Sequence, residues 1–254
     1  MHPLVSVVTV CFNAAGTIAT TLDSVRAQTW RPLESVVVDG GSKDGTQDIV
    51  ARYADVTGMV VSEADGGIYD AMNKGIDLAQ GEILHFLNAD DSFVDEGVIE
   101  AAVRVFLAEP NVDLVYGDAI YRTTEGAFLR RFVRVNSRNL LYGDLCHQVV
   151  FARRRVFERF GRFNLEYRIN ADYDWMLRVF RGGANVRYLP RAIVNYDAGG
   201  QSATNLSFTR SERLQVRLQY SNLSAYRIGE FGYRLRRKLL NKLGHTEFTP
   251  YADS

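Results

Sequence analysis

Several acidic and amide side chains follow short apolar runs in the first part of the chain. They are Asp39 in VVVDGGSKDGT, Asp65 in EADGGIYDAMNKG, and Asn88, Asp90 and Asp91 in FLNADD. Two carboxylates as close as Asp90 and Asp91 repel each other unless a cation or solvent separates them. Hard oxygen ligands suit Mg²⁺ or Mn²⁺, which usually binds through one or two carboxylates together with substrate phosphates and water. The FLNADD segment is therefore a candidate metal site.

Helix capping explains some of these polar residues without a ligand. Ser42 or Asp44 could cap the helix that follows Gly40 and Gly41, and an Asp pair before a helix is often a solvated N-cap. Asp39 stands before the turn, where capping does not account for it. Because glycine allows the close approach of another molecule, Asp39 could face a nucleobase or a ribose.

The segments between these residues predict the elements that position them. Leu4 to Cys11, Leu33 to Asp39, Met59 to Ser62 and Ile83 to Leu87 are short and β-rich, and helical patterns lie between them. This alternation indicates βαβ units and a mainly parallel sheet. In such a sheet, ligands bind outside the carboxyl ends of the strands, which is where the polar residues fall.

Two further patterns extend this α/β unit. Asp95 to Ala108 predicts a helix with one buried face, formed by Val98, Ile99, Ala102, Val103, Phe106 and Leu107, and Pro110 ends it. From Asp113 to Val135, two strand-like runs around Thr124, Glu125 and Gly126 predict a hairpin added to the parallel sheet.

The composition indicates a globular protein with no electrostatic case for a nucleic-acid partner. The 254 residues are 46% hydrophobic, and 30 basic residues balance 30 acidic ones. Cys11 and Cys146 are too far apart to resemble a disulfide framework or a zinc site. The start MHPLVSVVTV lacks the features of a signal peptide, and no run approaches the ~20 apolar residues of a membrane span. We expect a cytoplasmic location.

The C-terminal segment differs in charge from the rest of the chain. From Leu206 to Ser254 there are nine Lys or Arg and four Asp or Glu. We expect residues 1–205 to form the main domain and residues 206–254 a basic helical extension, with Ile228, Phe231, Leu235, Leu239 and Leu243 on one face and Arg234, Arg237, Lys238 and Lys242 off it. Such a helix either lies on an anionic membrane surface, at the inner face of the membrane, or docks on the body with its cations in solvent.

Taken together, the motifs resemble the inverting glycosyltransferases of family 2, which have the GT-A fold. The resemblance runs from Val5 to about Arg178 through SVVTVCFNA, VVVDGGSKDGT, EADGGIYDAMNKG, GEILHFLNADD, HQVVF and NADYDWMLR. Each motif alone is weak, but their common order and spacing make the resemblance specific. It implies an α/β protein of GT-A fold, with a Rossmann-like, mainly parallel central sheet flanked by helices, a small antiparallel extension and a C-terminal helical tail.

The resemblance also implies a nucleotide-sugar site. Thr9 and Asn13 would border the nucleotide, Asp39 would contact the base, and Asp65 would help to hold the nucleoside or its phosphates. Lys74 lies in a helical stretch, where its cation could neutralise diphosphate charge or simply be a surface charge.

The DxD-like element of the family would be Asn88-Ala89-Asp90. Asp90 would reach a Mg²⁺ or Mn²⁺ ion that bridges the diphosphate, with Asp91 beside it. Asn88 stands where Asp is commoner in the family, and its amide can still hydrogen-bond hydroxyl groups.

For the catalytic base, the resemblance indicates Asp172, at the start of a helix near the acceptor. Ala171 replaces the commoner Glu before it, and Asp174 is a lesser candidate. The helix dipole offers an alternative reason for acidic residues at this helix start. His147 and Gln148 resemble an acceptor-side or diphosphate-side element of the family.

The resemblance implies transfer of a sugar from a UDP- or GDP-sugar to an acceptor hydroxyl with inversion. The sequence has neither the Gln-x-x-Arg-Trp element nor the spanning helices of processive synthases, so we expect transfer of one sugar, to a saccharide or lipid-linked saccharide of a bacterial surface. One alternative is a nucleotidyltransferase that makes nucleotide sugars, but its N-terminal loop would carry a basic residue and CFNAAGT has none. The other alternative is a noncatalytic nucleotide-sugar-binding module.

Overall fold

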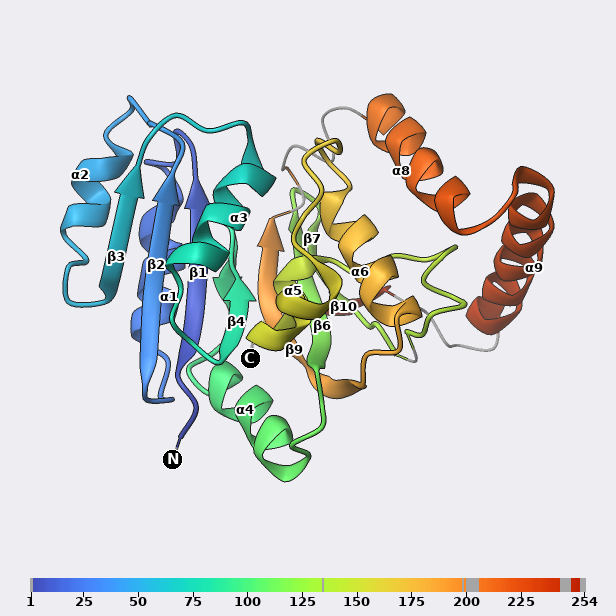
Figure 1. Ribbon diagram of the computed structural model, residues 1–254, viewed down its shortest axis with the longest axis horizontal. Coiled ribbons are helices and arrows are strands. Elements are labelled where there is room, and N and C mark those ends of the chain that lie inside the picture. Colours follow the sequence, from blue (N-terminus) through green and yellow to red (C-terminus); the bar gives the residue numbers. More distant parts are fainter. Residues whose placement is uncertain (1, 134, 198, 200–205, 243–247, 252–254) are drawn as a thin grey trace.

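A parallel sheet forms the first half of the protein. The computed structural model describes residues 2–133, 135–197, 199, 206–242 and 248–251. In it, β1 (Val5–Cys11), β2 (Leu33–Asp39), β3 (Thr57–Ser62) and β4 (Ile83–Phe86) pair in parallel in the order β3-β2-β1-β4. Helices α1 (Ile18–Arg26), α2 (Thr46–Ala51) and α3 (Ile68–Leu78) connect them (Figure 1). The four predicted strands are confirmed, with small shifts at their ends.

The burial of these strands reflects their positions in the sheet. Every residue of β1 is buried, as expected for a central parallel strand covered on both faces. Helix α3 approaches β1 so closely that a Cβ on Gly75 would lie 2.3 Å from Cγ1 of Val8. The chain leaves β1 toward β2 and later returns to β4 on the opposite side, which opens a crevice at the carboxyl ends of the strands.

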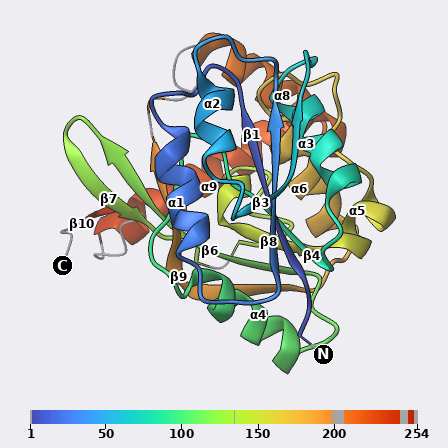
Figure 2. The ribbon, with the colours of Figure 1, turned by 90° about the vertical axis from the view of Figure 1, so that its left-hand side faces the viewer.

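The sheet continues beyond β4 with antiparallel pairs. Strand β8 (Val150–Arg153) pairs with β4 and with β6 (Leu114–Thr123), and the β6–β7 hairpin (β7, Gly126–Arg130) follows. The predicted hairpin and extension are therefore confirmed, although β8 separates the hairpin from the parallel strands. Figure 2 shows the hairpin projecting from the body.

The long strand β9 (Val186–Asp197) returns the chain to the crevice. It runs parallel to β6 and pairs with the two-residue strand β5 (Ser92–Phe93), where Asn195 lies opposite Ser92. Because β5 directly follows Asp91, this pairing brings the end of β9 beside the FLNADD loop.

The predicted helix at residues 95–108 is α4 (Val98–Ala108), and one of its expected core residues is wrong. Phe106 is buried, whereas Leu107 is half exposed. Successive residues differ by about 100° around a helix, so Leu107 lies beyond the edge of the face that contacts the sheet. The other helices of this region are the short η1 (His147–Val149), α5 (Arg154–Phe160) and α6 (Ala171–Arg181).

The C-terminal segment contains more than the expected helical tail. It forms α8 (Leu206–Tyr220) and α9 (Leu223–Lys242), followed by β10 (Phe248–Tyr251), which pairs with β7. Within the described ranges, no helix is both long and apolar enough to cross a bilayer. The boundary at residue 205 stays a prediction, and Leu243 lies outside the described residues.

Helix α8 is attached to the body through a buried carboxylate. Glu212 accepts hydrogen bonds from the backbone N–H groups of Arg168, Ile169 and Asn170 at 2.6, 2.9 and 2.7 Å. Arg213 also donates to Oδ1 of Asn170, at 3.1 Å. Since Asn170 precedes α6, α8 fixes the loop from which that helix starts.

Replacing Glu212 with alanine should lower the free energy of unfolding by about 3 kcal/mol, because each buried donor left without a partner costs about 1–3 kcal/mol. Urea denaturation would measure the change. Glu125→Ala, at the exposed tip of the β6–β7 hairpin, is the matched control. Equal losses in the two variants would contradict this account of how α8 is attached.

Candidate active site

Hydrogen bonds join the first two loops at the carboxyl edge of the sheet. The backbone N–H of Asn13 donates to Oγ of Ser42 at 2.7 Å, and the N–H of Lys43 donates to Oδ1 of Asn13 at 3.0 Å. Asn13 has a φ of +48°, in the left-handed region that Asn tolerates better than most residues. Asn13 is exposed, so the predicted nucleotide contact is open to it.

Asp39 lies buried beneath these loops. It accepts the backbone N–H and the hydroxyl of Ser42, and the hydroxyl of Ser62 at 2.5 Å. Burial alone would raise the pKa of Asp39, but the hydrogen bonds from Ser42 and Ser62 outweigh it and lower the pKa below its usual value. The carboxylate therefore ties the ends of β2 and β3 together, and its oxygens are already occupied by protein donors.

Thr9 does not reach the crevice. It is fully buried, two residues before the end of β1, so the implied border with the nucleotide cannot be formed by its side chain in this structure. The residue at the strand end on the same side is Cys11, whose thiol lies 3.6 Å from Oδ1 of Asp39. The SVVTVCFNA motif indicated the strand correctly but not which of its residues reaches the strand end.

Phe12 is a surface feature that the sequence analysis missed. Its side chain is 64% exposed, directly after a strand with no exposed residue. A Cβ built on Gly40 would lie 3.3 Å from the Phe12 ring and 2.7 Å from Oδ2 of Asp65. Gly40 thus lets an exposed aromatic ring and a carboxylate meet over the second loop. The signal was present, since an aromatic residue between Cys11 and Asn13 has no core to fill.

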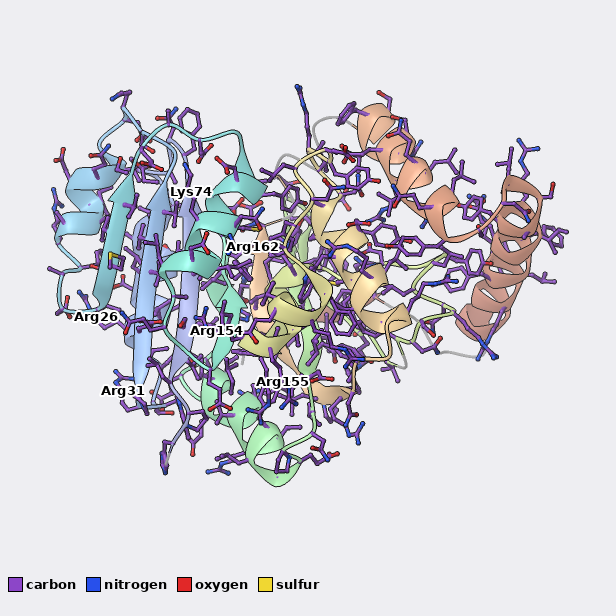
Figure 3. All side chains as sticks on the ribbon, viewed as in Figure 1. Arg26, Arg31, Lys74, Arg154, Arg155 and Arg162 are labelled. Carbon is purple, nitrogen blue, oxygen red and sulfur yellow. The ribbon has the colours of Figure 1, made fainter. Side chains whose placement is uncertain are left out.

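The third loop is held by its own charges. Asp65 accepts the N–H of Gly67 at 2.9 Å, and Asp70 accepts the N–H of Gly66 at 2.9 Å. Lys74, labelled on α3 in Figure 3, pairs with Glu63 at 2.8 Å and with Asp70 at 3.5 Å. Two carboxylates therefore already balance its charge, which favours a role in holding this loop.

The two carboxylates after β4 have different surroundings. Asp91 is 2% exposed and accepts Nε2 of Gln148 and the backbone N–H of Asp197, both at 3.0 Å. Burial, together with the charge of Asp90, holds the pKa of Asp91 well above its usual value. Ala89 is buried beside α1. The buried hydrogen bond between Gln148 and Asp91 thus supports the FLNADD loop from inside the protein.

Asp90 is the accessible carboxylate of this pair. Its side chain is exposed and makes no hydrogen bond to another residue in the described part of the chain. Partial desolvation, and then the negative charge of Asp197, raise its pKa above the usual value. Asp197 was not expected from the sequence, because it comes to Asp90 through the pairing of β9 with β5.

Asp172 lies in a hydrogen-bonded chain that reaches Asn88. It is the second residue of α6, and its Oδ2 lies 2.9 Å from Nδ1 of His147, which can donate to it. Nε2 of the same ring lies 3.2 Å from Oδ1 of Asn88. Asn88 suits either form of the ring, since it can offer Oδ1 to an N–H or, with its amide turned, Nδ2 to a bare nitrogen.

Tyr69 provides the second contact to the Asp172 carboxylate. Its hydroxyl lies 2.9 Å from Oδ1 of Asp172 and 2.6 Å from the carbonyl oxygen of Ile169. The sequence gave no signal for it beyond an aromatic residue in GGIYDAMNKG. Asp174, by contrast, is buried and accepts Nε of Arg178 at 2.9 Å and the hydroxyl of Tyr220 at 3.2 Å. Of the two carboxylates, Asp172 is therefore the one joined to the loop after β4.

The described side chains of the site do not form a complete cation site by themselves. Over the ranges that the structure describes, no cluster of three His, Cys, Asp or Glu could bind one. Asp90 offers one hard, accessible carboxylate, which forms no ion pair with Lys or Arg among the described residues. That donor set fits Mg²⁺ or Mn²⁺ held by one carboxylate, substrate phosphates and water.

Comparisons with known proteins identify the family of the chain. The family model described as Glycosyl transferase family 2 matches residues 6–185. The PGL/p-HBAD biosynthesis glycosyltransferase of Mycobacterium tuberculosis (strain ATCC 25177 / H37Ra) is 39% identical over 228 residues, which cover 85% of this chain and 88% of that protein.

Two solved structures share the fold. TarS 1-349 of S. aureus in complex with UDP-GlcNAc has a TM-score of 0.72 at 17% identity, over 93% of this chain and 72% of that one. The mannosyltransferase PcManGT from Pyrobaculum calidifontis, in complex with GDP-Man and Mn²⁺, has a TM-score of 0.67 at 23% identity, over 87% of this chain and 64% of that one. The expected GT-A fold is confirmed, and the chain belongs to glycosyl transferase family 2.

Proposed function

We propose that the protein transfers one sugar from a UDP- or GDP-sugar to a hydroxyl group of a saccharide or lipid-linked saccharide, with inversion and with Mg²⁺ or Mn²⁺ as cofactor. One observation carries this proposal. His147 connects the carboxylate of Asp172 to Asn88, in the same loop as the accessible Asp90. A base and a candidate metal ligand therefore belong to one connected site.

The donor class is supported by the similar structures and by the loops. TarS was solved with UDP-GlcNAc, and PcManGT with GDP-Man and Mn²⁺. In this chain, Phe12, Asn13 and Asp65 are among the accessible groups at the first three strand ends, where a nucleoside could stack and form hydrogen bonds. Asp39 would act from below, by keeping these loops together.

Asp90 would hold the metal, which when bound would offset the negative charge of the departing nucleoside diphosphate. Asp91 and Gln148 would keep the Asp90 loop in place. Lys74 could approach the diphosphate only by giving up a contact to Glu63 or Asp70.

The proposed reaction is a single displacement. The acceptor oxygen forms a bond to the anomeric carbon while the bond from that carbon to the diphosphate oxygen breaks, and the acceptor proton passes to Asp172. Attack opposite the leaving group inverts the anomeric centre. Tyr69 and His147 would hold the carboxylate of Asp172 in the orientation that accepts the proton.

A cytoplasmic location in a bacterium completes the proposal. Its support is the pair of free thiols, Cys11 and Cys146, and the bacterial sources of similar sequences. The acceptor would then belong to surface polysaccharide or glycolipid synthesis.

Replacing Asp172 with asparagine should lower the transfer rate by about 10²–10⁴-fold, because a general base contributes that factor, while donor affinity stays unchanged. Release of nucleoside diphosphate in the presence of acceptor would measure the rate, and a thermal shift with donor would measure binding. Asp77→Asn, an exposed carboxylate paired with Arg162, is the control. Full activity in the Asp172 variant would move the base to another residue.

Replacing Asp90 with asparagine should abolish the part of donor binding that depends on Mn²⁺. The change removes the accessible carboxylate of the loop after β4. A thermal-shift panel of nucleotide sugars with and without Mn²⁺ would detect this, since a ligand that binds the native state raises its apparent stability. Asp91→Asn is the matched control and should keep the Mn²⁺ effect. The opposite ranking would assign the metal to Asp91.

Replacing Phe12 with alanine should weaken donor binding about tenfold, because stacking of a base on an aromatic ring contributes about 1–3 kcal/mol. Titration of the donor by calorimetry would measure this. Leu165→Ala removes an exposed apolar side chain on a different loop and should have no effect. An unchanged donor affinity in the Phe12 variant would exclude the ring from the nucleotide site.

A further inference from the structure

Helix α9 packs on the body through one narrow face. Tyr226 is buried, and its ring stacks on that of Tyr142 with centroids 5.9 Å apart. A Cβ on Gly229 would lie 2.0 Å from the Tyr142 hydroxyl, so a larger residue there would displace the Tyr142 ring. Tyr233 continues the contact, with its ring 6.1 Å from that of Tyr142. These side chains, three and four residues apart, lie on the same side of the helix.

Three apolar residues of the face predicted for this helix lie on the side of α9 that points away from Tyr142. Ile228, Phe231 and Leu235 are 75, 71 and 60% exposed. Their spacing of three and four residues aligns them as well. We call these three residues the outward face of α9. The helix therefore docks on the body, as one of the two alternatives predicted, while these three apolar side chains face solvent.

Cations flank the outward face. A groove of about 690 Å³ between α8 and α9 is lined by five arginines and a single acidic residue, Glu230. Arg217 is turned inward, toward the hydroxyl groups of Tyr173 and Tyr226, and Arg234 pairs with Glu230. Arg210 and Arg227 are exposed, and neither forms an ion pair with a residue that the structure describes.

The charge and the exposed apolar side chains together select the occupant. From residue 206 to 242 the sequence has nine Lys or Arg but only two acidic residues, of which Glu212 is buried. A second copy of this surface would bring like charges together, and a nucleic acid would leave the apolar side chains in water. An anionic bilayer accepts both, because its headgroups attract arginine and its acyl boundary buries apolar side chains.

We propose that α8 and α9 form a peripheral membrane-binding surface. The outward face of α9 enters the headgroup and acyl boundary, while Arg210, Arg227 and the rim of the groove contact lipid phosphates. Helix α8 contacts both α9 and α6, so the bilayer would lie against the layer that holds the Asp172 loop (Figure 1). This inference does not depend on the proposed transfer reaction.

Co-sedimentation of the full-length protein with vesicles tests the proposal. Vesicles of phosphatidylcholine with 30% phosphatidylglycerol would be compared with pure phosphatidylcholine, at about 0.1 and 0.5 M salt. We expect binding to the anionic vesicles that falls with salt. The triple variant Ile228→Ser/Phe231→Ser/Leu235→Ser should partition at least tenfold less, and Arg210→Gln/Arg227→Gln should bind more weakly and with less salt dependence.

The control variant Met59→Ser/Val60→Ser/Leu107→Ser removes three exposed apolar side chains elsewhere and should bind like the unmodified protein. Phe231→Ser alone, with an unchanged Tm, guards against misfolding of the triple variant. The proposal is overturned if the unmodified protein ignores anionic vesicles, if it binds neutral ones equally, or if the triple variant binds normally. It is also overturned if light scattering shows a dimer that the triple variant dissociates, since the face would then be a subunit contact.

Discussion

The hydrogen bonds of one imidazole ring connect the two halves of the candidate site. His147 lies between Asp172 on α6 and Asn88 after β4, at 2.9 and 3.2 Å, and is largely buried. Asp172 is distant in sequence from the loops at the carboxyl ends of the parallel strands, and this link adds to the contact from Tyr69 in setting the position of its carboxylate. A base that must reach an acceptor oxygen aligned with the donor needs its geometry fixed to a fraction of an ångström. The ring supplies that constraint from inside the protein.

The pattern of satisfied and unsatisfied carboxylates separates structure from chemistry. Asp39, Asp91 and Asp174 are buried, and protein donors occupy their oxygens. Burying a carboxylate without hydrogen-bond partners costs free energy, so these contacts make it possible for the three acidic side chains to be buried. Asp90 is exposed and has no such partner among the described residues, which is why we propose it as the ligand of a cation. The supporting carboxylates thus hold the loops, one of which presents the accessible Asp90.

The C-terminal helices are part of the site's architecture as well as of its surface. Glu212 accepts hydrogen bonds from three backbone N–H groups just before α6, so α8 helps to fix the start of the helix that carries Asp172. The same helix forms one wall of the arginine-lined groove. Arg213 takes part in both, because it lines the groove and donates to Asn170, so a segment outside the family match at residues 6–185 also contacts the start of α6.

The sequence by itself determined the fold class, the four parallel strands, the hairpin and the positions of Asp39, Asp65, Asp90 and Asp172 near strand and helix ends. These features depend on local periodicity and on the order of motifs, both of which a single chain displays. Only the tertiary structure decided which side chains are accessible. Thr9 is buried and Phe12 is exposed. Asp91 accepts hydrogen bonds from Gln148 and Asp197, whereas Asp90 accepts none from another described residue, and Tyr69 and Asp197 approach from distant segments. Burial and hydrogen-bond partners arise from contacts between residues far apart in sequence, which no local pattern records.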